Sequence, residues 1–77
     1  MNNYEVLRVD YNTAARIPDF HTWDLDDRWR VLRQTIGSET SPASEAKLAV
    51  LDSIPVEKRA MAIDSLEIAR KRDKPSN

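Results

Sequence analysis

The chain has 77 residues but no cysteine, only one glycine, one histidine, two tryptophans, two tyrosines and one phenylalanine. Without cysteine the protein cannot form a disulfide, a thiolate zinc site or a thiol nucleophile. A single glycine excludes phosphate-binding loops of the Walker and dinucleotide types, which need several glycines. The composition therefore predicts a protein without a nucleotide cofactor, and no motif for any other cofactor is present.

Long apolar runs and an excess of one charge are absent as well. No segment approaches the roughly 20 apolar residues of a membrane-spanning helix, and the residues after Met1 lack the basic and apolar regions of a signal peptide. Twelve basic residues nearly balance thirteen acidic ones, giving a net charge of −1. A balance of this kind gives no global attraction to nucleic acid or anionic lipid. We therefore expect a cytoplasmic protein that does not bind membranes.

The length of the chain predicts one small domain over residues 1–77. A core of this size supplies only about 3–5 kcal/mol of net stability. Small domains without disulfides or metals often gain stability by burying surface against another chain. We therefore expect a partner protein or a second copy of the same chain.

The first 23 residues are the most ambiguous part of the sequence. Residues 4–11, YEVLRVDY, fit both the alternation of a strand and a helical spacing of Tyr4, Leu7 and Tyr11. The valines and tyrosines favour a strand, which would have to pair with a second copy or a partner because no other strand is evident. Residues 12–23, with Pro18, are interpreted as a connection. The segment 1–23 is therefore predicted to be extended, although whether residues 4–11 are strand or helix stays open.

The pattern over residues 24–36 predicts an amphipathic helix, because Leu25, Trp29, Leu32 and Ile36 fall on one face. Asp24 is expected at the N-cap, with Asp27 in the position of a capping box. Ion pairs at i,i+4 are expected between Asp24 and Arg28 and between Asp26 and Arg30. Gly37 is expected to follow the helix as its C′ residue.

Two further helices are predicted, over residues 42–53 and 55–72. Ser41 and Pro42 suit the N-cap and first position of a helix, and the broad apolar surface of 42–53 predicts that it is the central helix. Pro55 ends that helix and starts the next. Residues 73–77 are expected to form a frayed tail. The predicted fold is mostly α, a bundle of about three helices over residues 24–72.

His21 lies close to Asp24, Asp26 and Asp27, a set that could bind a metal. Capping and compensation of the helix dipole explain these aspartates better, and a second histidine is missing. Catalysis would need an activated nucleophile and an oxyanion hole besides the histidine. The sequence therefore predicts neither a metal site nor an enzyme.

Four residues form the candidate binding surface: Phe20, Trp23, Arg30 and Arg33. Tryptophan and arginine are over-represented in the energetically dominant positions of protein interfaces. Phe20 and Trp23 are expected either to cover one end of the bundle or to face a partner. The basic run Arg70-Lys71-Arg72 is explained by the helix dipole, with phosphate contact as the alternative.

These features predict a non-catalytic helical interaction module that acts on a partner protein as a regulator, inhibitor or assembly factor. The alternative is a dimeric DNA-binding regulator or antitoxin. A strand at 4–11 followed by helices, with the segment GSETSPASEAKLAVL, resembles the ribbon-helix-helix organisation, in which paired strands enter the major groove. The chain departs from that family in its long connection after the strand, its acidic Glu5 and Asp10, and its lack of basic charge.

Overall fold

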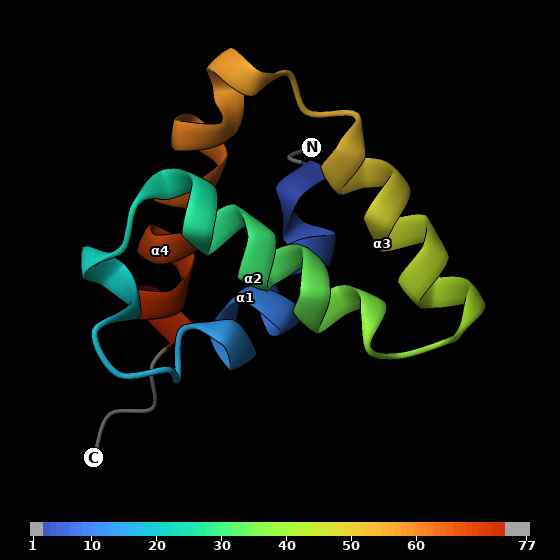
Figure 1. Ribbon diagram of the computed structural model, residues 1–77, viewed down its shortest axis with the longest axis horizontal. Coiled ribbons are helices and arrows are strands. Elements are labelled where there is room, and N and C mark those ends of the chain that lie inside the picture. The colour runs from blue at the N-terminus through green and yellow to red at the C-terminus, as the bar shows by residue number, and fades with distance from the viewer. Residues whose placement is uncertain (1–2, 74–77) are drawn as a thin grey trace.

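The computed structural model describes residues 3–73, which form four α-helices linked by turns and three short 3-10 helices (Figure 1). The mostly α fold is confirmed, but residues 3–73 contain no strand and one α-helix more than predicted. The expected tail over 73–77 lies outside the described residues, apart from Asp73 at the end of α4. The elements in chain order are η1 (Asn3–Leu7), α1 (Arg8–Ala14), η2 (Phe20–Thr22), α2 (Leu25–Gly37), α3 (Pro42–Asp52), η3 (Val56–Lys58) and α4 (Arg59–Asp73).

The prediction of an extended N-terminal segment is wrong, because residues 3–14 are helical. The helical spacing of this segment outweighs its strand propensity. Leu7 and Tyr11 are completely buried and Ala14 is nearly so, while Tyr4 packs against the same core. An isolated strand would have left its backbone groups without partners, whereas a helix satisfies them internally and buries one apolar face.

The predicted helix at 24–36 is present as α2, with Asp24 at the N-cap position. The Asp24 side chain makes no capping hydrogen bond, so the capping box does not form. Gly37 is the last residue of the helix instead of a left-handed C′ residue, since its φ is not positive. The C-cap is Ser38, in right-handed helical geometry, and its Oγ donates a hydrogen bond of 2.8 Å to the Thr35 carbonyl.

The start of α3 is as predicted: Pro42 is its first residue and the Ser41 side chain accepts a hydrogen bond of 3.2 Å from the Ser44 amide. The expected central position of this helix is wrong. Only Ser44 and Leu51 of α3 are buried, and α3 lies at one edge of the molecule, opposite α4 (Figure 1). Three of its apolar residues are alanines, which cover little area, and Leu48 and Val50 are only partly buried.

The core lies where α1, α2 and α4 pack together, with η2 closing one end. The unpredicted helix α1 occupies the position that the sequence assigned to α3. The twelve buried apolar residues come from almost every element: Leu7, Tyr11, Ala14, Phe20, Trp29, Leu32, Ile36, Leu51, Ile54, Ala62, Ile63 and Leu66.

Candidate interaction surface

Trp23 lies between η2 and α2 and is half-buried. Its backbone is extended (φ −73°, ψ 158°), which directs the chain from the 3-10 turn into the helix. The indole ring packs on Phe20, with ring centroids 5.4 Å apart, and Phe20 in turn meets the edge of Tyr11 at 5.8 Å. Three aromatic rings therefore run from the core to the surface, and they hold Trp23 in place.

An open depression of about 430 Å³, the Trp23 groove, lies beside this ring. Trp23 and Val31 supply its apolar lining, and Arg30 reaches it from the exposed side of α2. The Arg30 guanidinium lies 3.5 Å from the Asp27 carboxylate, and the two side chains are 66% and 50% exposed. An exposed pair at this distance contributes at most about 1 kcal/mol, so the Arg30 guanidinium can exchange Asp27 for another anion. The lining residues are Thr22, Trp23, Asp24, Asp27, Arg30 and Val31.

The structure brings two of the four candidate residues together, Trp23 and Arg30. Phe20 is only 1% exposed and belongs to the core, so it covers the end of the bundle and supports Trp23 from beneath. Arg33 makes two hydrogen bonds of 3.1 and 3.2 Å to Asp52 of α3. These bonds raise the pKa of Arg33 and tie α2 to α3, so its side chain is engaged within the fold.

The aspartates next to the Trp23 groove have few partners. The predicted ion pairs of Asp24 with Arg28 and of Asp26 with Arg30 do not form among the described residues, where Asp27 takes Arg30 instead. Arg28 is half-buried, and its Nε has no hydrogen-bond partner within residues 3–73. The surface between η2 and the first turn of α2 is therefore acidic: Asp19, Asp24, Asp26 and Asp27.

His21 makes no hydrogen bond in the described part of the chain and is exposed on η2. Within residues 3–73, no three side chains of histidine or acidic type are grouped to hold a metal ion. A second open depression, of about 440 Å³, lies around the loop between α2 and α3, but it brings together serines, a threonine and glutamates without a base of the histidine type. Ser44, beneath it, donates its hydroxyl proton to the Ile36 carbonyl.

A partly buried polar chain joins α1 to α4, and sequence reasoning missed it. The Tyr11 hydroxyl donates a hydrogen bond of 2.7 Å to Oε1 of Glu67, and Arg70 donates from Nη2 to Oε2 at 2.6 Å. The hydrogen bonds from Arg70 have the largest effect on the Glu67 carboxyl and lower its pKa. Burial raises this pKa and the hydrogen bond from Tyr11 lowers it, so that the pKa lies below its ordinary value. Burial, helped by Glu67, raises the pKa of Tyr11. The i,i+3 spacing of Glu67 and Arg70 was a visible signal, but the link to Tyr11 was not.

A second ion pair crosses from α1 to α3. Lys47 lies 2.9 Å from Oδ2 of Asp10, whose residue is only 6% exposed. This pair and the Tyr11 chain fix α1 on two sides, which is a structural role and leaves the Trp23 groove as the candidate site.

No helix in residues 3–73 is both long and apolar enough to cross a membrane. Comparisons with models of known protein families, with curated proteins and with solved structures gave no match.

Proposed function

We propose that this protein is a non-catalytic protein–protein interaction module, which acts on a partner protein as a regulator, inhibitor or assembly factor. The observation that carries the proposal is the Trp23 groove, in which a half-buried indole ring lies beside a weakly paired arginine. A rigid aromatic ring supplies contact area at low entropic cost, and Arg30 supplies directional donors. Both residue types dominate the energetics of protein interfaces.

The alternative, a DNA-binding function, was suggested by a predicted strand over residues 4–11 that the structure does not contain. Residues 4–11 are helical, so they cannot form the paired strands of a ribbon-helix-helix dimer. Arg70 is engaged by Glu67, which leaves Lys71 and Arg72 as the exposed cations of the basic run. Two cations make a weak phosphate-binding surface.

Affinity capture from a lysate of the source cell, with and without nuclease, tests the proposal. The expected result is one stoichiometric protein partner that survives nuclease and is lost with Trp23→Ala and with Arg30→Glu. Val56→Ala is the matched control, because Val56 is 70% exposed on η3 and does not line the Trp23 groove. Recovery that disappears with nuclease, or that is indifferent to both groove variants while circular dichroism shows them folded, would refute the proposal.

A further inference from the structure

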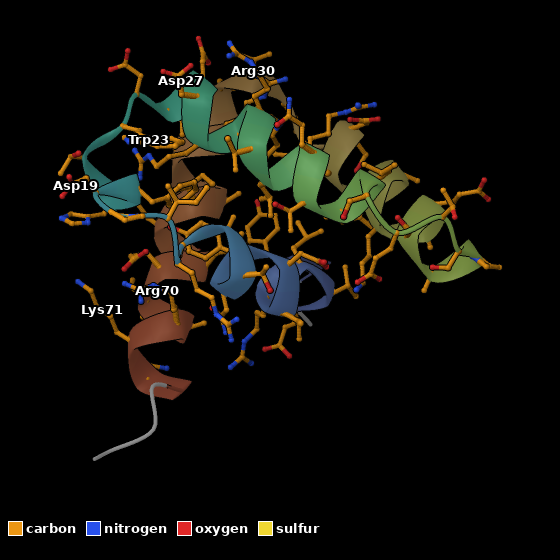
Figure 2. All side chains as sticks on the ribbon, turned by 60° about the horizontal axis from the view of Figure 1, so that its bottom comes forward. Asp19, Trp23, Asp27, Arg30, Arg70 and Lys71 are labelled. Carbon is orange, nitrogen blue, oxygen red and sulfur yellow. The ribbon has the colours of Figure 1, made fainter. Side chains whose placement is uncertain are left out.

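One end of the molecule carries opposite charges on its two halves. η2, the start of α2 and the C-terminal half of α4 meet at this end (Figure 1). Figure 2 shows Asp19, Trp23 and Asp27 along one part of the edge, and Arg70 and Lys71 along the other. We call the first part the acidic half, comprising Asp19, Asp24, Asp26 and Asp27, and the second part the basic half, comprising Arg70, Lys71 and Arg72.

The two halves do not neutralise each other within the chain. Arg30 takes up Asp27, and Glu67 takes up Arg70, but no ion pair in residues 3–73 joins the acidic half to the basic half. Of the seven charged residues that make up the two halves, three carboxylates and two cations have no ion pair within residues 3–73, and all five residues are exposed: Asp19, Asp24, Asp26, Lys71 and Arg72.

A surface with an acidic and a basic half side by side complements itself. A two-fold axis through this end places the acidic half of one copy over the basic half of the other, and both contacts form at once. Ile68, one turn before Arg72 on α4, is 55% exposed and adds an apolar side chain next to the cations. Trp23 and Val31 in the groove offer apolar surface of the same kind beside the aspartates.

We propose that the occupant of the Trp23 groove is a second copy of this chain, bound about a two-fold axis, so that Lys71 and Arg72 of each copy contact Asp24 and Asp26 of the other. This inference rests on the proposed function and names its partner. The charge complementarity of the two halves, together with their position at one end of the molecule, favours a second copy over an unrelated chain.

The size of this end limits the area that two copies can bury in a dimer. The molecule measures 34 × 27 × 26 Å, and the two halves lie at one end of its long axis. The two shorter extents, 27 and 26 Å, limit the projected area of this end to at most roughly 550 Å², less than the about 800 Å² per partner of a stable interface. We therefore expect a weak dimer whose charges are exposed at the rim. The screening length falls from about 10 Å at 0.1 M salt to about 3 Å at 1 M, so dimerisation weakens as salt rises.

Sedimentation equilibrium of the full chain, from about 20 μM to about 1 mM, covers the range expected for an interface of this size. Two charge reversals provide the test. The first variant carries Lys71→Glu and Arg72→Glu, and the second carries Asp24→Lys and Asp26→Lys. Each alone is expected to weaken dimerisation about ten- to hundredfold, because four exposed ion pairs become repulsive. An equimolar mixture is expected to recover a heterodimer, since each reversed half then meets its complement.

The matched control carries Glu39→Lys and Glu45→Lys, which make the same change in net charge as the second variant but beside the α2–α3 loop, at the opposite end of the molecule (Figure 1). It is expected to dimerise like the unmodified chain. Circular dichroism checks that each variant is folded, and the neutral variants Lys71→Gln with Arg72→Gln serve if a reversal unfolds the chain. Recovery of dimer in the mixture supports the inference.

Three results would overturn it: a monomer at every concentration, a dimer that both reversals leave intact, or a mixture that stays monomeric. A monomeric chain that nevertheless captures a protein through Trp23 would leave the proposed function standing and reject only the second copy as occupant. A chain that dimerises through its charged end but captures no other protein would support this inference and limit the function to self-assembly.

Discussion

Replacing Tyr11 with phenylalanine is expected to lower the free energy of unfolding by about 1–2 kcal/mol. The substitution keeps the ring, which is completely buried and packs edge-on against Phe20. It removes one hydroxyl group, whose hydrogen bond of 2.7 Å to Glu67 links α1 to α4 across 56 positions of sequence. The change therefore tests one polar contact with little disturbance of packing.

The magnitude follows from the state of Glu67 after the substitution. A hydrogen bond to a charged group contributes about 1.5–3 kcal/mol. The carboxylate keeps its bonds to Arg70, and its side chain is 19% exposed, so water can replace part of the lost contact. The expected loss, about 1–2 kcal/mol, therefore lies around the lower end of that range, and for a domain of this size it corresponds to a fall in melting temperature of roughly 4–16 °C. Glu67→Ala is expected to cost at least as much, because it leaves the Tyr11 hydroxyl buried without an acceptor.

Urea denaturation followed by circular dichroism measures both variants and their combination. Because the two residues share one interaction, the double variant should be hardly less stable than Glu67→Ala alone. Ser53→Ala is the control, since it removes an exposed hydroxyl that bonds locally to the Val50 carbonyl and should change stability by less than about 0.5 kcal/mol. A loss for Tyr11→Phe no larger than this control, or strict additivity with Glu67→Ala, would refute the account of the chain.

Three further predictions concern single residues. Hydrogen bonds from Arg70, the largest influence, hold the pKa of Glu67 below its ordinary value of 4.5. Because the unfolded state binds a proton more readily than the folded state, the stabilisation by Glu67 is complete above pH 4.5 and is lost as the pH falls through the folded pKa. Urea midpoints measured against pH should show this loss for the unmodified chain and not for Glu67→Gln. Gly37→Ala should stabilise the protein by about 0.4–1 kcal/mol, because Gly37 is helical and a methyl group there meets open space; a loss of thermal stability would show that it needs a left-handed conformation. Asp19 has a φ of 63°, so Asp19→Val should cost about 1–2 kcal/mol in denaturant titrations while Asp19→Asn is nearly neutral, and equal stability of the two would contradict that geometry.

Helices set by neighbouring residues in the sequence were predicted correctly, whereas features set by contacts between distant residues were not. The start of α3 was predictable because Ser41 and Pro42 act on their immediate neighbours, and α2 was predictable from the helical spacing of its buried residues Trp29, Leu32 and Ile36. The helix at residues 3–14 was not, because strand propensity and helical spacing competed in one short segment. Burial of Leu7 and Tyr11 against distant helices decided between them, and a single sequence does not show which distant residues will supply that contact.

The candidate site shows the same division. Trp23 and Arg30 were identifiable by residue type, and their proximity follows from the start of α2 between them. The orientation of Arg33 was not identifiable, since it depends on Asp52, 19 positions further along. Phe20 was open to two interpretations, and only its contact with Tyr11 assigns it to the core.

One chain of contacts connects the Trp23 groove to the basic half of the same end. Trp23 packs on Phe20, Phe20 meets Tyr11, and Tyr11 bonds to Glu67, which holds Arg70. The rings of Tyr11, Phe20 and Trp23 pack in or against the core, and the bonds between Glu67 and Arg70 are partly buried. The spacing between the groove and the basic half is therefore set by packed rings and short hydrogen bonds, which also hold η2 in the connection between α1 and α2. A surface fixed in this way needs little ordering when it binds, which reduces the entropic cost of association. For an interface as small as this end allows, that reduction decides whether any binding is measurable.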